Sequence, residues 1–148
     1  MMTILASAMI AATDPVTPAD RSAILAPIDA AFVALEKQDS AELLRHVYPE
    51  GRVVAVGTLG SGKQVFRRES WTDYAARMKP GNGFKERIID PTIAIDGDIG
   101  LVWAMFTIEV GGKITACGYD HFDMVRQDGT WKIMNITFSS RTTGCPGQ

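Results

Sequence analysis

The sequence predicts an α+β protein in which N-terminal helices pack on one face of an antiparallel sheet. Helix-start signals and apolar residues at helical spacing occur in the first half of the chain. In the second half, four long stretches alternate with a period of two. The links between these stretches are "DGD", "GG" and "DG", all typical of β-hairpin turns. Four consecutive strands joined in this way form an antiparallel meander.

Two helices are expected first. "TPAD", residues 17–20, begins one of them, with Thr17 as the cap and Pro18 in the first position. Apolar side chains then recur at helical spacing from residue 24 to residue 35. Pro27 lies inside this pattern, so we expect a kink or an interruption there. "DSAE", residues 39–42, begins the second helix, which Pro49 and Gly51 end.

Two short strands follow, "RVVAVGT" from residue 52 and "QVFRRE" from residue 64. The segment that joins them, "GTLGSGKQ", matches the G-x-x-x-x-G-K pattern of phosphate-binding loops. Its next position is Gln64, which offers no hydroxyl to a magnesium ion, and a strand-like stretch follows where such a loop needs a helix. The sequence therefore favours a flexible hairpin loop over a nucleotide site.

The third helix begins at "SWTD", residues 70–73, and stops at Pro80-Gly81. The four long strands are expected at residues 84–95, 99–110, 113–126 and 130–141. Within them, we expect Trp103, Phe122 and Trp131 to be buried, together with Phe32 of the first helix.

The chain is divided into a leader at residues 1–16, one domain at 17–142 and a tail at 143–148. "ILASAMIAA", from residue 4, resembles the apolar region of a secretory signal, although no Lys or Arg precedes Arg21. This favours a periplasmic or secreted protein, with a disordered leader on a cytoplasmic protein as the alternative. The net charge of −2 without basic runs argues against nucleic acid as a partner, and no apolar stretch is long enough to span a bilayer.

The two cysteines, Cys117 and Cys145, are too few for a disulfide scaffold and are not spaced like a metal site. Either both are free thiols, one in the core and one in the tail, or they form a bridge in an exported protein. The two histidines, His46 and His121, provide neither a catalytic triad nor a metal site.

Asp120 is the candidate catalytic residue, because alternation places it on the same strand face as apolar side chains. A two-residue turn at Asp128-Gly129 would set Asp120 opposite Thr137 and Phe122 opposite Asn135. A three-residue loop with a bulge would bring Tyr119 and His121 to that face instead. The first register is favoured because it keeps four large side chains on one buried face: Phe122, Met124, Trp131 and Ile133.

Asp120 has two possible roles. In an apolar cavity its pKa would be raised, which suits a general acid/base. Alternatively, its carboxylate is structural and accepts hydrogen bonds from Asn135, Thr137 or a backbone N–H.

The chain resembles the nuclear transport factor 2-like superfamily, and within it the SnoaL-like and "putative lumazine-binding" branch. The likeness covers roughly residues 20–141 and is most specific in the last hairpin. There, Asp128-Gly129 precedes Trp131, Lys132 and Ile133, and Asp120 lies upstream where such families often carry an acidic residue. "IDGDIGLVWAMF", from residue 95, resembles the preceding hairpin of the family.

The resemblance implies a cone-shaped, curved antiparallel sheet wrapped around a long helix, described as a cystatin-like α+β barrel. It also implies a conical pocket and usually a homodimer. It does not imply one function, because the superfamily includes isomerases, dehydratases, cyclases, carriers and non-catalytic assembly domains.

We expect a pocket that binds a small apolar or aromatic molecule without a cofactor. The expected ligand-binding residues are Phe32, Trp71, Tyr74, Met78, Arg87, Trp103, Phe122, Asn135 and Thr137. The alternatives are a cofactor-free isomerase, dehydratase or cyclase that uses Asp120, and an interaction domain whose pocket its own side chains fill. The lack of a second acid/base partner for Asp120 in the sequence favours a binding protein over an enzyme.

Overall fold

The computed structural model describes residues 15–81 and 83–148, so the apolar segment of the expected leader lies outside the described residues. The elements are α1 (Pro18–Lys37), α2 (Ser40–Arg45), β1 (Arg52–Thr58), β2 (Gln64–Ser70), α3 (Trp71–Ala76), β3 (Lys85–Asp96), β4 (Ile99–Val110), β5 (Lys113–Gln127) and β6 (Thr130–Ser140). The four long strands match the predicted ranges to within one residue at nearly every end.

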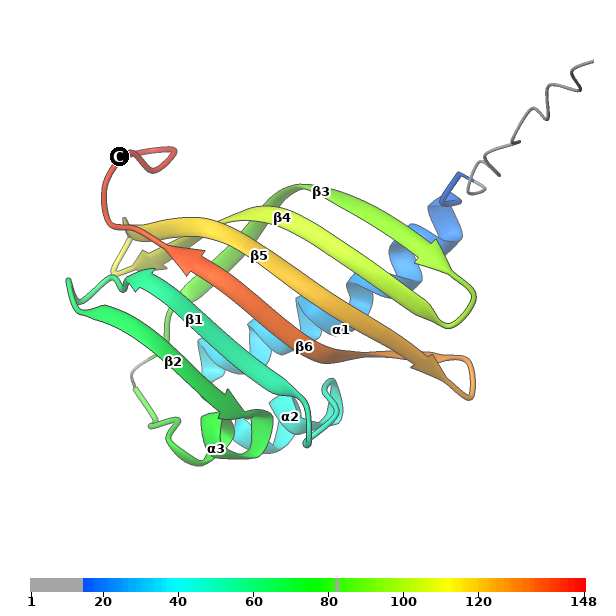
Figure 1. Cartoon of the computed structure of the whole chain (residues 1–148). Coiled ribbons are helices and arrows are strands. Elements are labelled where there is room, and N and C mark those ends of the chain that lie inside the picture. The colour runs from blue at the N-terminus through cyan, green and yellow to red at the C-terminus, as the bar shows by residue number, and fades with distance from the viewer. Residues whose placement is uncertain (1–14, 82) are drawn as a thin grey trace, which may run out of the picture.

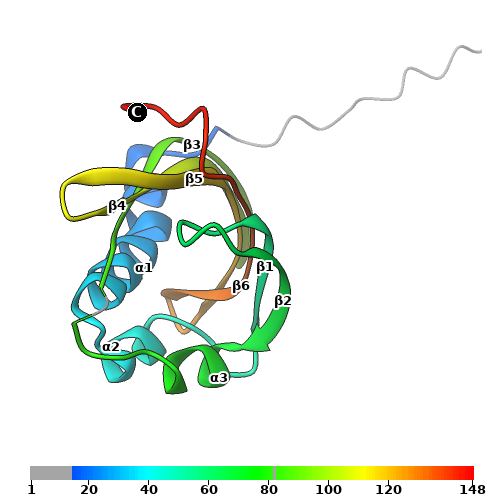
Figure 2. The same cartoon turned by 90° about the vertical axis from the view of Figure 1, so that its left-hand side faces the viewer.

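The strands form one six-stranded sheet in the order β2-β1-β6-β5-β4-β3. Strands β1 and β6 run parallel, and every other neighbouring pair is antiparallel. Figure 1 shows α1 crossing one face of this sheet, and Figure 2 shows the sheet curving around α1, with α2 and α3 at one end. The α+β class and the curved sheet are confirmed. Because β2 and β3 are the two edges of the sheet, the expected barrel is not closed.

The helices begin at their predicted caps. The Thr17 side chain accepts a hydrogen bond from the Asp20 N–H at 3.1 Å, and Asp39 and Ser70 cap α2 and α3 in the same way. Helix α1 continues through Pro27 as one element, so the chain is not interrupted there. It ends at Gln38, which adopts a left-handed conformation with φ 55°.

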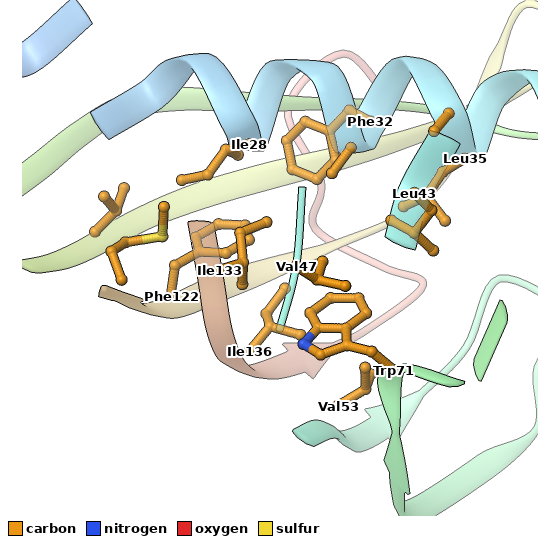
Figure 3. Close-up of a cluster of buried hydrophobic side chains, with 14 of the residues drawn as sticks. Ile28, Phe32, Leu35, Leu43, Val47, Val53, Trp71, Phe122, Ile133 and Ile136 are labelled. Carbon is orange, nitrogen blue, oxygen red and sulfur yellow. The ribbon is translucent and has the colours of Figure 1, made fainter. Parts of the chain in front are cut away.

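The core lies between α1 and the concave face of the sheet (Figure 3). Phe32 of α1 meets Phe122 of β5 edge to face, with ring centroids 6.1 Å apart. Trp71 packs into the same cluster and donates a hydrogen bond from its indole N–H to the Met134 carbonyl at 3.0 Å. The predicted burial of Phe32, Phe122 and Trp131 is confirmed.

Trp103 is not buried. It is 46% exposed on the outer face of β4, where it stacks on Tyr119 at 5.2 Å. Smaller residues, Val102 and Ala104, occupy the inner face at this level. Both faces of this strand are apolar, so alternation alone could not decide which one faces the core.

The last hairpin has the predicted turn but a different register. Asp128 and Gly129 have φ values of 51° and 78°, as a two-residue type I′ turn requires. The register then shifts between Asp123 and Met124. Beyond this bulge, the observed pairs are Asp123 with Asn135, Phe122 with Ile136, His121 with Thr137, and Asp120 with Phe138. The expected pairs of Asp120 with Thr137 and Phe122 with Asn135 are therefore wrong.

The C-terminal tail folds back onto β5. Cys117 and Cys145 form a disulfide, with their Cα atoms 5.6 Å apart. Cys117 also exchanges two backbone hydrogen bonds with Arg141, both at 2.9 Å. Of the two alternatives left open by the sequence, the structure has the bridge, which encloses β6 and its preceding turn.

Candidate functional site

A cavity of about 640 Å³ opens between the concave face of the sheet and helices α1 and α3. This volume is within the range of small-molecule sites in proteins. Five exposed residues of the lining mark its opening to solvent: Gly60, Ser61, Arg77, Gly81 and Val110. Two of them belong to the β1–β2 turn, so "GTLGSGKQ" is a hairpin loop at the mouth of the cavity, in agreement with the prediction.

The wall of the cavity is largely apolar and includes seven aromatic side chains. Phe32, Trp71, Tyr74 and Phe122, four of the expected ligand-binding residues, lie in it. The sequence analysis missed three more, which are Phe84, Phe106 and Phe138. Rings meet edge to face at 6.0 Å between Trp71 and Tyr74 and at 6.1 Å between Phe106 and Phe138. Such a wall suits an apolar or aromatic molecule.

Glu86 is the buried carboxyl group of the cavity wall. It projects from the inner face of β3 and is only 7% exposed. Its carboxyl lies within hydrogen-bonding range of Asp120, which projects from β5 and is 1% exposed. Asp120 does not itself line the cavity, and neither of its oxygens receives a hydrogen bond from a donor among the described residues. The cavity therefore presents Glu86, with Asp120 beside it.

The proximity and burial of the two carboxyls disfavour their ionisation. Burial raises the pKa of Glu86 to about 8, although the hydrogen bond with Asp120 opposes this rise. Burial and the charge of Glu86 raise the pKa of Asp120 well above its usual value. Two adjacent carboxyls in an apolar site cannot both be charged at low cost, so the pair retains a proton at neutral pH.

A second polar group lies where α3 meets β2. Glu69 accepts hydrogen bonds from Arg77 at 2.7 and 3.0 Å. Arg67 Nε is 2.8 Å from the same carboxylate, but its N–H does not point along a hydrogen bond. The Arg77 guanidinium stacks over the Tyr74 ring at 4.4 Å. Arg67, Arg77 and Tyr74 all line the cavity.

Tyr74 is neutral over the physiological pH range. Burial and the nearby charge of Glu86 raise its pKa to about 12, while Arg77 and Arg67 oppose the rise. Its hydroxyl makes no hydrogen bond to the other described side chains, so it is available to a ligand.

Several expected site residues lie elsewhere. Arg87 follows Glu86 on the edge strand β3 but lies outside the cavity lining, 3.8 Å from Glu36 of α1. Met78 packs against the core just beyond α3, outside the cavity lining. Trp103 is on the outer face, as described above.

Asn135 and Thr137 also lie on the outer face, because the bulge in the last hairpin reverses their orientation. They line a second, shallower depression with His121 and Asp123. Asn135 accepts a hydrogen bond from the Arg52 N–H at 2.9 Å and donates one to Asp123 at 2.8 Å. These polar groups satisfy one another and do not contact Asp120 across the sheet.

Strand alternation in the sequence indicates the inward orientation of Glu86. In "FKERII", from residue 84, alternation places Glu86 on the same face as Phe84 and Ile88. The register of β3 against β4 shifts only later, between Ile89 and Thr92. This irregularity, which contains Pro91, therefore does not affect the orientation of Glu86.

Within the described part of the chain, no group of His, Cys, Asp and Glu side chains could hold a metal ion. No helix of that part is long and apolar enough to cross a membrane.

Comparison with known proteins identifies relatives of the same architecture. Residues 19–139 match the family described as "Putative lumazine-binding". No curated protein matches the chain significantly. The solved structures that resemble it include a cystatin-like-fold protein of unknown function from Nostoc punctiforme, with 12% identity, a TM-score of 0.68, and coverage of 88% of this chain and 97% of the other.

Two further structures are of NTF2-like proteins. The first, from Novosphingobium aromaticivorans, has 14% identity and a TM-score of 0.68, and the match covers 86% of this chain and 85% of the other. The second, of unknown function and from Methylobacillus flagellatus, has 20% identity and a TM-score of 0.60, with coverage of 87% and 98%. At these identities the likeness establishes the fold alone.

Proposed function

Because the chain belongs to the "Putative lumazine-binding" family of the nuclear transport factor 2-like superfamily, we propose that it is a small-molecule-binding domain whose ligand occupies the cavity. The observation that carries this proposal is the cavity of about 640 Å³ with a largely apolar wall that includes seven aromatic side chains. The fold alone would not suffice, because one fold hosts many functions. The ligand class that the wall favours is an apolar or aromatic molecule with few polar groups.

Filling the cavity tests this proposal. Ile108 lines the cavity and is half-buried, so Ile108→Trp should occupy part of the space. With 2-naphthylmethanol as the probe, calorimetry should show a loss of affinity of at least about tenfold, which corresponds to ~1.4 kcal/mol. Val56 is 43% exposed and lies outside the lining, so Val56→Trp is the matched control and should bind as the wild type does. Equal affinity in both variants would mean that the probe does not use the cavity.

A second candidate function is proton transfer, favoured by the Glu86–Asp120 pair. A cofactor-free isomerase, dehydratase or cyclase needs a carboxyl that titrates near neutral pH. Asp120 was the expected acid/base, but Glu86 is the member of the pair that reaches the cavity, so Asp120 would act through Glu86. Exchange of the α-deuterium of 2-tetralone tests this function. Wild-type protein should accelerate the exchange and Glu86→Gln should not; absence of acceleration by the wild type would exclude this substrate class.

The disulfide between Cys117 and Cys145 supports an oxidising location, in keeping with a periplasmic or secreted protein. Fractionation of cells that express the full chain tests this. Recovery of the oxidised protein only from the cytoplasm would contradict it.

A further inference from the structure

We propose that the cavity takes a small organic amine, whose ammonium group binds the Glu86 carboxylate while its apolar body lies against the aromatic wall. This inference rests on the proposed small-molecule-binding function and assigns the polar end of the ligand. It is carried by the position of Glu86 in the cavity wall and by the unused hydrogen-bonding capacity of the carboxyl pair.

The carboxyl pair lacks donors. Neither oxygen of Asp120 has a hydrogen-bond donor among the described residues, and no described side chain donates to the Glu86 carboxyl. The one hydrogen bond at this position, from Arg87 at 2.6 Å, goes to the backbone carbonyl of Glu86. The two Glu86 oxygens, which reach the cavity, therefore have no donor other than the protons of the pair itself. A ligand that donates hydrogen bonds would satisfy them, and a ligand that only accepts would leave them unpaired.

The charges around Glu86 are compatible with a cation. On β3, Lys85 and Arg87 lie near Glu36 of α1, at 3.9 and 3.8 Å, and so point away from the cavity. From β5, Asp120 faces Glu86, and from β4 the neighbour in register is Ile108. A single bound ammonium would be the compensating positive charge of this site.

The two arginines of the lining do not oppose this arrangement. Both contact Glu69, and their charges act on Tyr74, whereas burial and Asp120 govern the pKa of Glu86. Tyr74 lies near both groups, since its ring is 4.4 Å from the Arg77 guanidinium and the charge of Glu86 raises its pKa. A monoamine with an apolar body fits this distribution better than a diamine, whose second charge would approach the arginines.

The aromatic wall adds a second attraction for an ammonium group. The faces of Phe and Trp rings attract cations, most strongly where water is excluded. Phe84 immediately precedes β3, the strand of Glu86, and Phe106 lies on β4 with Ile108; both rings line the cavity. Protonated amines are therefore favoured over neutral analogues of the same shape.

Binding of an ammonium should also release a proton. The cation stabilises the ionised form of Glu86, so Glu86 loses its proton to the buffer while Asp120 keeps its own, and the ammonium–carboxylate pair forms. The amine enters and remains as the cation. A neutral alcohol with the same body causes no such release.

Two probes with the same body test the inference: 2-naphthylmethylamine and 2-naphthylmethanol. Calorimetry at about pH 7 in buffers of different ionisation enthalpy gives both the affinity and the number of protons released. Wild-type protein should bind the amine at least about tenfold more tightly than the alcohol, a difference of ~1.4 kcal/mol, and release a proton only with the amine. Glu86→Gln should abolish both the preference and the release. The matched control is Glu50→Gln, an exposed position outside the cavity, which should retain them.

Each alternative result is decisive. Equal affinity for amine and alcohol in the wild type overturns the inference but leaves the proposed function standing, provided Ile108→Trp weakens both. A preference that survives in folded Glu86→Gln also overturns it. If neither probe binds the wild type, the inference and the proposed function both fail. Should Glu86→Gln not fold, as circular dichroism would show, the wild-type preference and proton release decide alone.

Discussion

At the scale of single residues, Glu86 and Asp120 make the stability of the fold depend on pH. Their folded-state pKa values lie above those of the unfolded chain, because both carboxyls are buried and adjacent. At a pH between the unfolded-state and the folded-state pKa of each carboxyl, the folded protein therefore binds more protons than the unfolded chain. The contribution of the protonated carboxyls to the unfolding free energy is fully present below the unfolded-state pKa. It is lost as pH rises toward the folded-state pKa, which is about 8 for Glu86.

Asp120→Asn should weaken this pH dependence. Wild-type protein is expected to lose about 1–3 kcal/mol of unfolding free energy between about pH 5 and pH 8, and the variant should lose clearly less. Urea denaturation at both pH values provides the measurement. Asp128→Asn, in the exposed β5–β6 turn, is the matched control and should behave as the wild type. A wild-type stability that rises over this range would show that the pair is ionised in the folded protein.

The sequence could determine the orientation of Asp120 but not its pairing with Glu86. The inward orientation of Asp120 was predicted, because Phe122 and Met124 share its face and are buried. Its partner Glu86 comes from a strand two positions away in the sheet. Curvature of the sheet brings the two together, and no local pattern in the sequence encodes that approach.

At the scale of elements, the last hairpin shows that the turn sequence determines the turn type, whereas tertiary packing determines the strand register beyond it. The "DG" pair determined the type I′ turn, as predicted. The bulge after Asp123 arises from tertiary packing: it turns Ile133 and Ile136 toward the core, although they are separated by an odd number of positions. An uninterrupted alternation would have exposed one of them. The expectation that Asn135 and Thr137 line the cavity is wrong for this reason.

The C-terminal element should depend on its disulfide. Cys145→Ser is expected to lower the unfolding free energy by about 2–4 kcal/mol, because the bridge restricts the unfolded chain. Denaturation with and without reductant measures the effect. Reduction should bring the wild type to the stability of Cys145→Ser and leave the variant unchanged. Two free thiols in aerobically purified protein would contradict the bridge.

At the scale of the whole molecule, the order of elements could be predicted because each boundary has its own local signal, a cap, a turn or a change of period. The curvature of the sheet and the cavity could not be derived from these signals. They depend on how far the sheet bends around α1 and on which side chains leave space between them. The curved sheet and the cavity are expected only because the chain resembles a known family.

The outer face of the sheet is proposed as the interface of a homodimer. It exposes large apolar side chains, among them Leu101, Trp103 and Tyr119 at 37%, 46% and 38%. Light scattering should give the mass of a dimer for the wild type and of a monomer for Trp103→Glu. Phe66→Glu, at an exposed position on the edge strand β2, is the control and should remain dimeric. A monomeric wild type at high concentration would contradict the proposal.

The proposed ligand lies between α1 and the concave face of the sheet, where methyl NMR with isoleucine labelling can detect it. Ile108, Ile133 and Ile136 line the cavity, while Ile89 and Ile99 are exposed outside it. Titration with 2-naphthylmethanol should shift the three inner methyl signals through the ring current of the probe and leave the two outer signals in place. Shifts confined to Ile89 and Ile99, or no shifts at all, would contradict ligand binding in the cavity.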